Sequence, residues 1–321
     1  MTLADPVLVA DIGGTNARFA LATVGAAGIA VSDRQTFRAE DFETIRDAAA
    51  AYLESVAPKP KRACFAAAGP IIDNAVDFTN SHWILRGDEI AAALAFDDFL
   101  IVNDFYALAA GIAHLPASAL IEVKPGDPIV DAPRLVIGPG TGLGQALIVP
   151  TTTGDRIIAT EGGHVSYAPR TELETEIKRF IAREHPRVSV ERLLSGRGLV
   201  NIHRALCAIE GAQRISLQAN EITAAAVSGA YPIAVKAVDM FCAILGRVAG
   251  DAVLSTGARG GVILGGGILP KIRDIFLKSE FIVRFSEKGR MSDYVAAVPV
   301  RLIVEDGAAL YGAAASLGKK A

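Results

Sequence analysis

A turn rich in glycine near the start of the chain carries the first side chains that could do chemistry. An apolar stretch ends at Asp11, residues 13–16 read Gly-Gly-Thr-Asn, and apolar residues resume at Phe19. Glycines can adopt backbone angles closed to other residues, and without a Cβ atom their N–H groups can approach an anion closely. The threonine and asparagine add donors, and Asp11 ends a strand where a hydrated Mg²⁺ could bind. The stretch 7–21 is therefore predicted as strand, turn and strand, either a phosphate-binding turn or an ordinary β-hairpin.

A second stretch, residues 135–149, repeats this design. It too consists of an apolar strand, a glycine turn that contains Gly-Thr, and another apolar strand. When Gly14 is aligned with Gly140, Ile137 stands where the first stretch has Asp11. Two similar turns that open two halves of one chain predict two related domains that close on one ligand. Neither turn matches the G-x-G-x-x-G pattern or the Walker phosphate loop, and each is followed by a strand where a dinucleotide fold needs a helix.

A carboxylate also stands at the end of a buried strand in the middle of the chain. The apolar run Phe99–Val102 stops at Asn103 and Asp104, and a helical pattern follows over residues 105–112. In α/β sheets, ligands usually bind at the carboxyl ends of strands, so Asp104 is a candidate site residue. It could equally be the N-cap of the helix, because aspartate is a favoured capping residue.

The elements that must position these residues alternate between strands and helices, which predicts a mixed α/β fold. In the first third of the chain we expect a helix over 40–56, strands over 63–68 and 75–78, and a short helix over 88–96. Residues 115–133 are rich in proline, aspartate and glycine and are the predicted linker between two domains.

The second half of the chain continues this alternation. Thr171 with Glu174 predicts a capping box at the start of a helix. Glu191 lies in the first turn of another short helix, where it could be a surface acid that complements the helix dipole. The predicted strands are 156–160, 260–268 and 298–304, and the predicted helices are 171–184, 189–196, 199–209, 216–227, 232–254 and 307–317.

Composition excludes several classes of protein. A chain of 321 residues with a net charge of -3 and a pI of about 6.0 has no basic excess for binding nucleic acid. Cys64, Cys207 and Cys242 form no C-x-x-C pair, and no two histidines have the spacing of a zinc site, so reduced thiols in the cytosol are expected. The N-terminus lacks the pattern of a signal peptide, and no run reaches the roughly 18 to 20 uncharged residues of a membrane helix. A soluble cytoplasmic protein is predicted.

Seven short motifs occur in order along the chain. They are Ala10-Asp-Ile-Gly-Gly-Thr-Asn-Ala-Arg18, Thr79-Asn-Ser-His-Trp83, Asn103-Asp-Phe105, Gly138-Pro-Gly-Thr-Gly-Leu-Gly144, Glu161-Gly-Gly-His164, Glu191-Arg-Leu-Leu-Ser-Gly196 and Leu264-Gly-Gly-Gly267. Together they resemble the bacterial glucokinases of the ATP-dependent, hexokinase-like kind, over residues 7–312. The chain lacks the cysteine-rich zinc motif and the N-terminal helix-turn-helix of the related group called ROK.

This resemblance implies a fold. The family has the two-domain, actin-like ATPase (ribonuclease H-like) α/β fold, with the sugar and ATP bound in a cleft between the domains. We therefore expect a small α/β domain of residues 1–114, completed by a C-terminal helix within 305–321, and a large α/β domain of residues 115–304.

The resemblance also implies a sugar site. Asp104 is similar to the family's general base, which takes the proton from the sugar 6-hydroxyl, and Asn103 to the ligand of the 3- and 4-hydroxyls. Glu191 is similar to the ligand on the anomeric side, and Gly142 to a backbone contact near the 6-hydroxyl. Two further residues, Glu161 and His164, are similar to additional sugar ligands.

An ATP site and a magnesium ion are implied as well. Asp11 would hold Mg²⁺ directly or through water, Thr141 matches a second phosphate loop, and Gly265 with Gly266 matches the adenosine site. The loop for the β- and γ-phosphates consists of Ala10, Asp11, Ile12, Gly13, Gly14, Thr15 and Asn16.

The function that the resemblance implies is phosphorylation of D-glucose at the 6-hydroxyl by MgATP, the first step of glycolysis. From the family we expect a homodimer, with no nucleic-acid or membrane partner. The alternatives are a kinase for another hexose, such as mannose or an N-acyl amino sugar, and a non-catalytic sugar sensor or an actin- or Hsp70-like ATPase of the same fold. A dehydrogenase is a more distant alternative. The residue pairs Asn103-Asp104 and Glu161-x-x-His164 favour a sugar kinase, because adjacent hydroxyls need both donors and acceptors.

Overall fold

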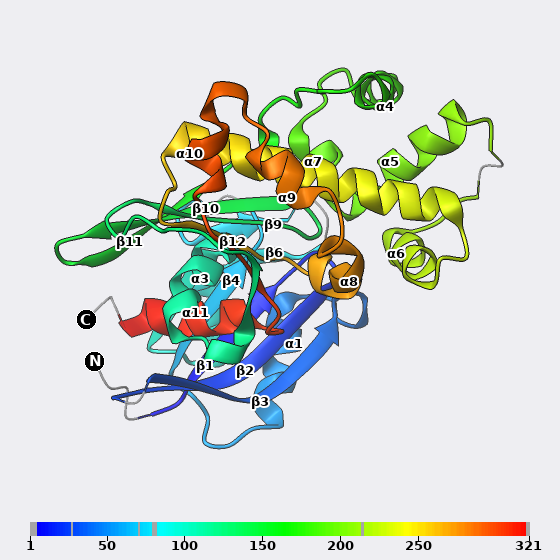
Figure 1. Ribbon diagram of the computed structural model, residues 1–321. Helices are drawn as coiled ribbons and strands as arrows, with labels where there is room; N and C mark the ends of the chain where they lie inside the picture. Colours follow the sequence, from blue (N-terminus) through cyan, green and yellow to red (C-terminus); the bar gives the residue numbers. More distant parts are fainter. Residues whose placement is uncertain (1–4, 27, 70, 79–81, 213–214, 319–321) are drawn as a thin grey trace. The chain divides into compact units, whose positions relative to one another are not determined.

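The computed structural model describes residues 5–26, 28–69, 71–78, 82–212 and 215–318 (Figure 1). Thr79, Asn80 and Ser81 of the second motif lie outside the described residues. The chain divides into two compact units. Unit 1 comprises Met1–Ala119, Ile157–Ala159 and Glu305–Ala321, and unit 2 comprises Leu120–Arg156 and Thr160–Val304.

Unit 1 is built on a five-stranded sheet with the order β3-β2-β1-β4-β7. Its strands are β1 (Val7–Ile12), β2 (Asn16–Gly25), β3 (Gly28–Arg38), β4 (Arg62–Ala67) and β7 (Asp98–Asn103). The predicted hairpin of β1 and β2 is confirmed, and β4 and β7 run parallel to β1. The sequence did not predict β3, because the side chains of this strand are mostly exposed and its apolar run, residues 28–31, is short.

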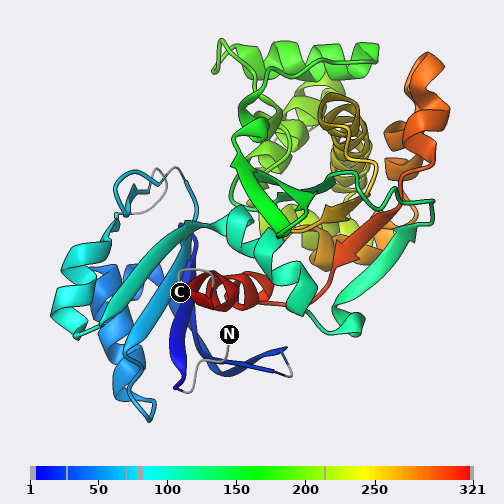
Figure 2. The ribbon, with the colours of Figure 1, turned by 90° about the vertical axis from the view of Figure 1, so that its left-hand side faces the viewer.

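Helices cover both faces of this sheet, so β1 is buried on both sides. Leu8, Ala10 and Ile12 belong to one apolar cluster, which α1 (Ile45–Glu54) and α2 (Gly87–Leu94) help to form. Val7 and Val9 belong to the other, which α3 (Asp104–Gly111) and α11 (Ala308–Gly318) complete. Figure 2 shows α11, in red, lying against the sheet. A strand enclosed in this way is expected to be apolar without interruption, as residues 7–10 are.

Close contact between the backbones of α3 and α11 depends on two glycines. A methyl group on Gly111 would lie 2.7 Å from the Ala308 carbonyl oxygen, and one on Gly312 would collide with the Ala107 carbonyl oxygen. The predicted C-terminal helix of small residues is confirmed, and its small residues allow this packing.

Two predictions for unit 1 are wrong in part. The helix expected from residue 40 begins at Ile45, because the Thr44 side chain accepts the Asp47 N–H as an N-cap and a short 3₁₀ turn, η1 (Ala39–Asp41), precedes it. The strand predicted over 75–78 is β5 (Ala75–Asp77), which pairs with β6 (Ile84–Arg86) in a separate two-stranded sheet and buries only Val76.

Unit 2 is built on a six-stranded sheet with the order β11-β10-β9-β12-β13-β8. Its strands are β8 (Leu120–Lys124), β9 (Arg134–Pro139), β10 (Leu143–Thr151), β11 (Gly154–Thr160), β12 (Gly261–Leu264) and β13 (Val300–Ile303). As in unit 1, an antiparallel hairpin is followed by two parallel strands, here β12 beside β9 and then β13. The predicted repeat is thus visible in the order and direction of the strands.

β8 contradicts part of the predicted linker. It forms the edge of the sheet, antiparallel to β13, and the prolines and glycines that follow it hid this strand in the sequence. Lys124 at the end of β8 is buried, and its ammonium group donates to the carbonyl oxygens of Pro125 (3.0 Å), Val298 (3.1 Å) and Ala296. Burial lowers the pKa of this lysine.

The helices of unit 2 surround a long central helix. They are α4 (Glu172–Ala182), α5 (Gly196–Ile209), α6 (Ala219–Ser228), α7 (Pro232–Thr256), α8 (Arg273–Phe276), α9 (Phe281–Ser286) and α10 (Ser292–Ala296). The central helix, α7, contributes residues along most of its length to the core. Gly246 and Gly250 let it approach α9, because a methyl group on either would collide with a carbonyl oxygen of that helix.

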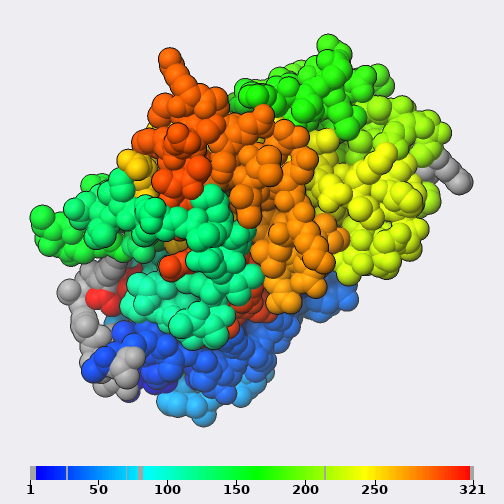
Figure 3. All heavy atoms as spheres, in the orientation of Figure 1, coloured from blue at the N-terminus to red at the C-terminus, as the bar shows by residue number. Residues whose placement is uncertain are grey.

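Pro270 predicts the start of a helix, and at that point a 3₁₀ turn, η6 (Leu269–Ile272), leads into α8. The short helices α9 and α10 were not predicted, because five or six residues are too few to establish a helical period. In Figure 3 their segment, in orange, forms part of the visible surface of unit 2. At α4 the expected N-cap is confirmed, since the Thr171 hydroxyl oxygen accepts the Glu174 N–H. The Glu174 carboxylate does not complete the capping box, however, and faces Arg247 instead.

Cys64, Cys207 and Cys242 are all buried, and none of the three forms a disulfide. Among the described residues, none of the helices combines the length and the apolar composition that crossing a bilayer requires.

Candidate active site

The first glycine turn joins β1 to β2 in unit 1. The Gly13 N–H donates to the Asn16 carbonyl oxygen at 2.9 Å, and the Thr15 carbonyl oxygen accepts the Ala39 N–H at 2.8 Å. Gly13 does not adopt a left-handed φ, so the expectation of unusual backbone angles is wrong at this residue. Because the Gly13 N–H is used inside the turn, the amides of Gly14 and Thr15 are the better candidates to donate to a phosphate.

Asp11 lies at the end of β1, directly opposite Arg18 in the hairpin. Its carboxylate is 3.3 Å from Arg18 Nη1, and Arg18 Nε is 3.6 Å from an oxygen of Asp306. Burial raises the pKa of the Asp11 carboxyl; Arg18 opposes this effect and the negative charge of Asp306 adds to it. The side chain remains 23% exposed, so an ion could reach it.

This donor set fits a magnesium ion that is shared with phosphates. Mg²⁺ prefers oxygen ligands and is commonly held by one or two carboxylates, several waters and the phosphates of a nucleotide. Within the described residues no group of three or more acidic, histidine or cysteine side chains could hold a metal ion. Asp11 is therefore suited to hold a hydrated Mg²⁺ only together with ligands that come from elsewhere.

Asn103 and Asp104 lie where β7 ends and α3 begins. The Asn103 side chain is the N-cap: its Oδ1 accepts the N–H groups of Phe105 (2.9 Å) and Tyr106 (3.0 Å), and its Nδ2 donates to the Gly69 carbonyl oxygen at 3.4 Å. Asp104 is the first residue of the helix, so the alternative that Asp104 is the N-cap is wrong. One oxygen of its carboxylate accepts the Phe105 N–H at 2.9 Å. Both side chains are thus oriented by the backbone at the carboxyl end of a parallel strand.

The second glycine turn, between β9 and β10, packs against the end of β12. A methyl group on Gly138 would collide with the backbone of Gly265, and one on Gly266 would collide with the Pro139 carbonyl oxygen. Gly266 also has a φ of +83°, which few other residues tolerate. Thr141, exposed at the tip of the turn, and the two glycines after β12 therefore lie at the same edge of the sheet in unit 2.

Glu191 is attached to this second turn. It lies in η5 (Val190–Arg192), a 3₁₀ turn that replaces the predicted helix over 189–196, and its Oε2 accepts the Leu143 N–H at 2.9 Å. The same oxygen would be 2.5 Å from a methyl group on Gly142. The interpretation of Glu191 as a surface acid of a helix is therefore wrong, because its carboxylate is bound by the backbone of β10.

Glu161 and His164 are the two ends of a tight turn that follows β11. A 3₁₀ turn, η4 (Gly162–His164), brings His164 Nε2 to 3.7 Å from Glu161 Oε2. The turn lies close to β10, since a methyl group on Gly163 would collide with the Leu143 carbonyl oxygen. Both functional side chains are more than half exposed, at 63% for Glu161 and 56% for His164. They are open to a ligand.

The candidate residues thus fall into two sets. Unit 1 contributes Ala10, Asp11, Ile12, Gly13, Gly14, Thr15, Asn16, Asn103 and Asp104. Unit 2 contributes Thr141, Gly142, Glu161, His164, Glu191, Gly265 and Gly266.

Two polar residues beside Asp11, namely Arg18 and Asp306, were not predicted from the sequence. Arg18 could have been found from the hairpin, since a short turn after Asp11 sets these two residues opposite each other, whereas nothing in the sequence signals Asp306.

Comparison with known proteins agrees with the family that the motifs resemble. A protein-family model described as Glucokinase matches residues 8–320. A curated glucokinase of Chromobacterium violaceum is 45% identical over 313 residues, which cover 97% of this chain and 89% of the relative. A crystal structure of a glucokinase from an Antarctic psychrotroph is 39% identical, with a TM-score of 0.84, and covers 99% of this chain and 100% of that chain.

A more distantly related structure supports the predicted fold. A ROK-family glucokinase from Streptomyces griseus, solved with glucose and AMPPNP, has a TM-score of 0.69 at 21% identity and covers 99% of this chain and 100% of that chain. At this identity the likeness establishes only the shared fold, which is the predicted actin-like ATPase fold. The family model and the close relatives span nearly the whole sequence, and the chain belongs to the glucokinase family.

Proposed function

We propose that this protein transfers the γ-phosphoryl group of ATP to the 6-hydroxyl of glucose, with Asp104 as the general base. The observation that carries the assignment is the position of Asp104, at the carboxyl end of β7 and the start of α3, beside Asn103. Membership of the glucokinase family already makes the chain an ATP-dependent glucose kinase. The proposal adds the acceptor hydroxyl and the roles of individual residues.

The chemistry needs little covalent help from the protein. The oxygen of the 6-hydroxyl attacks the γ-phosphorus, a new O–P bond forms, the bond to the β-phosphate oxygen breaks, and ADP leaves. Asp104 takes the proton of the hydroxyl as its oxygen attacks. Its carboxylate suits this role because a backbone N–H fixes its orientation at 2.9 Å. The products are glucose 6-phosphate, ADP and a proton on Asp104.

Glucose would be recognised by side chains that donate and accept hydrogen bonds. We propose Asn103 for the 3- and 4-hydroxyls and Glu191 for the anomeric side, with further bonds from Glu161 and His164. The exposure of Glu161 and His164 and their 3.7 Å separation support this, because adjacent hydroxyls can bridge such a pair. A sugar that lacks one of these hydroxyls would leave a site group without its partner, which penalises its binding.

The two glycine turns would serve the phosphates. The amides of Gly14 and Thr15 in unit 1 and Thr141 in unit 2 are the proposed donors, and Gly265 with Gly266 would border the adenosine. Asp11 would hold the magnesium ion, which supplies neutralising charge on the β- and γ-phosphates when bound. Glucose 6-phosphate production of this kind would be the first step of glycolysis in the cytoplasm. A homodimer without nucleic-acid or membrane partners is expected from the family.

The decisive variant is Asp104→Asn, which keeps the shape of the side chain and removes its basic oxygen. We expect glucose affinity within an order of magnitude of wild type, and a turnover number that falls by about 10²- to 10⁴-fold. Calorimetry would measure binding and an ADP-release assay would measure turnover. Asp88→Asn is the control, because Asp88 is also in the first turn of a helix in unit 1 but belongs to no candidate site. Wild-type turnover in Asp104→Asn would overturn the assignment.

The substrate itself is tested by a panel of sugars in the same assay. Glucose should give the highest kcat/KM, and mannose and N-acyl amino sugars should give lower values. A higher value for any of these sugars would replace glucose as the preferred substrate.

A further inference from the structure

The two turns that carry His164 and Glu191 are tied together by a short antiparallel bridge. Ser166 pairs with Ser189, and on either side of this pair the Tyr167 N–H donates to Val188 O and the Val190 N–H to Val165 O, each at 2.9 Å. Arg187 adds a hydrogen bond from its guanidinium to the His164 carbonyl oxygen at 2.7 Å. Contacts that hold residues 165–167 in place therefore also hold both turns.

Tyr167 is the residue of this bridge that is anchored in the interior. Its ring is buried, and its hydroxyl donates to Glu174 Oε2 at 2.7 Å. Its carbonyl oxygen accepts a hydrogen bond from the Lys178 ammonium at 3.0 Å. Glu174 and Lys178 are both on α4, so this helix holds Tyr167 by its side chain and by its backbone.

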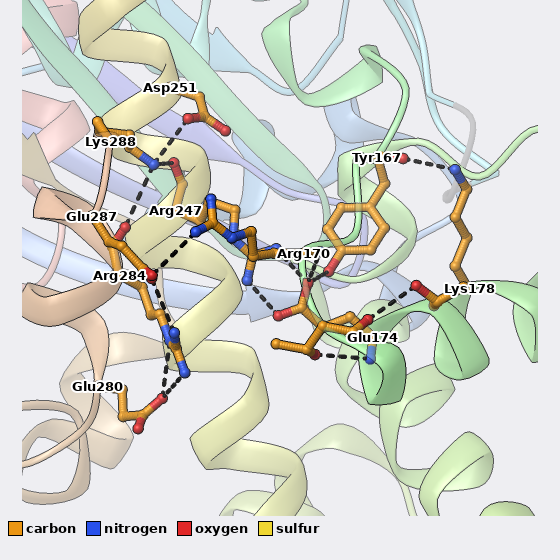
Figure 4. A network of polar contacts seen from close by, with 12 residues as sticks. Tyr167, Arg170, Glu174, Lys178, Arg247, Asp251, Glu280, Arg284, Glu287 and Lys288 are labelled. Atoms are coloured by element: carbon orange, nitrogen blue, oxygen red, sulfur yellow. Dashed lines mark hydrogen bonds and ion pairs between the residues drawn. The ribbon is translucent and has the colours of Figure 1, made fainter. Parts of the chain in front are cut away.

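The Glu174 carboxylate is in turn fixed by several donors. It is only 2% exposed, and the guanidinium of Arg247 on α7 bonds both of its oxygens. The Arg170 N–H donates to Oε2 as well, at 2.8 Å. Burial by itself would raise the pKa of this carboxyl, but the hydrogen bonds from Arg247, Arg170 and Tyr167 outweigh it and lower the pKa. Figure 4 shows the Tyr167 hydroxyl and the Arg247 guanidinium converging on this one carboxylate.

A buried ion pair is a poor means of adding stability, because the cost of removing two charges from water offsets most of their attraction. The ion pair between Glu174 and Arg247 instead holds the groups around it in a single geometry. Donors from α7, from the segment before α4 and from the tyrosine ring meet on two oxygens, so the ring can take only one position without leaving a buried polar group unpaired. Such a fixed geometry matters for side chains that bind a sugar, because a small displacement of these side chains weakens binding.

We propose that Tyr167, Glu174 and Arg247 are positioning residues for sugar recognition, which hold His164 and Glu191 through the bridge between 165–167 and 188–190. This inference rests on the proposed function, in that His164 and Glu191 bind glucose. The ion pair between α4 and α7 then contributes to the affinity and specificity for glucose, and not to the binding of ATP.

The test is Tyr167→Phe, which removes one hydroxyl and keeps the ring. We expect the KM for glucose to rise about three- to tenfold, which is less than the full worth of a hydrogen bond to a charged group, because Tyr167 acts on the sugar ligands only through the bridge. The KM for ATP should stay within about twofold of wild type, because the hydrogen bonds of Tyr167 described above all go to α4 and to Val188, and none goes to a candidate phosphate turn. Arg247→Lys should raise the KM for glucose less than Arg247→Met does, since lysine keeps the charge and loses only the paired geometry.

Lys288→Met is the matched control. Lys288 is also buried and bonded to α7, through the Arg247 carbonyl oxygen (3.0 Å) and Asp251 (2.9 Å), but on the side of α9, away from Tyr167 (Figure 4). We expect this variant to lower the melting temperature and to leave the KM for glucose unchanged. An equal rise in the KM for glucose in Lys288→Met and Tyr167→Phe would overturn the proposal, since both would then act by general softening of unit 2.

The outcomes separate this inference from the proposed function. If wild-type protein does not phosphorylate glucose, the proposed function fails. If wild type does, and Tyr167→Phe leaves the KM for glucose unchanged, the positioning role fails and the proposed function stands. Because Tyr167→Phe loses only one oxygen atom, it is expected to fold even if the charged variants do not.

Discussion

Gly142→Ala tests whether the second turn holds Glu191 in place for glucose. The added methyl group would lie 2.5 Å from Glu191 Oε2 and 3.3 Å from Cδ. The carboxylate would have to move by about 0.9 Å to reach an ordinary contact distance. A shift of that size away from β10 breaks the 2.9 Å hydrogen bond from the Leu143 N–H, because such a bond is lost beyond about 3.6 Å.

The loss of glucose affinity can be estimated from this one hydrogen bond. A hydrogen bond to a charged group is worth about 1.5 to 3 kcal/mol, and the lower value applies here because Glu191 is only partly buried. A loss of about 1.5 kcal/mol corresponds to roughly tenfold weaker glucose binding if the displaced carboxylate no longer meets the sugar. Calorimetric titration with glucose, without ATP, measures this directly.

Gly140→Ala is the comparison for this experiment. A methyl group at Gly140 would meet no atom within 4 Å, so this variant should melt at the wild-type temperature and lose less glucose affinity than Gly142→Ala. If Gly142→Ala binds glucose as tightly as wild type, the carboxylate held by Leu143 is not a ligand of the sugar, and the role proposed for Glu191 is refuted.

Three further predictions concern stability. Lys124→Met removes the donor to three carbonyl oxygens, of which that of Val298 is buried, and should lower the free energy of unfolding by about 2 to 4 kcal/mol. Lys236→Met, whose ion pair is exposed, should lower it by less than about 0.5 kcal/mol; urea titration would measure both, and equal losses would contradict the reasoning. Burial lowers the pKa of His203 below its ordinary value of 6.5, so the unfolded chain binds the proton first and wild-type stability should fall as the pH drops below 6.5. His203→Phe should flatten that part of the stability curve, and an unchanged slope would exclude His203 as its cause. Gly312→Ala should force α3 and α11 apart and lower the free energy of unfolding, measured by thermal unfolding, by about 1 to 3 kcal/mol. Gly318→Ala places its methyl group near no other atom and should change this free energy little. Equal melting temperatures of the two variants would contradict the close packing.

The sequence predicted those elements whose side chains are buried. The hairpins of 7–21 and 135–149, the strand before Asn103 and the central helix α7 all have apolar patterns long enough to read. β3 and the helices α9 and α10 were not predicted, because the pattern of β3 is largely polar and the two helices are too short. β8 escaped because it stands beside the prolines and glycines that mark a linker.

The candidate site was predictable as a set of residues but not as a set of contacts. The resemblance in motif order made Asp104, Glu161, His164 and Glu191 candidates. The bond between Glu191 and the Leu143 N–H, however, joins residues 48 positions apart and has no local signal. The role of Glu174 was misread for the same reason. Its spacing from Thr171 is that of a capping box, and only the approach of Arg247 from α7 shows why the carboxylate turns inward.

The repeated glycine turns differ in the acidic residue that each of them holds. The first turn closes on its own backbone, through the bond from Gly13 to Asn16, and has Asp11 at the end of its leading strand. In the second half the matching residue is Ile137, which is fully buried, so no acid can reach a ligand from that strand. The acid of the second turn comes from a different segment, as Glu191, and binds the turn through Leu143. This difference supports the roles proposed for the two turns, in which the first binds a cation and phosphates and the second binds a hydroxylated substrate beside a phosphate.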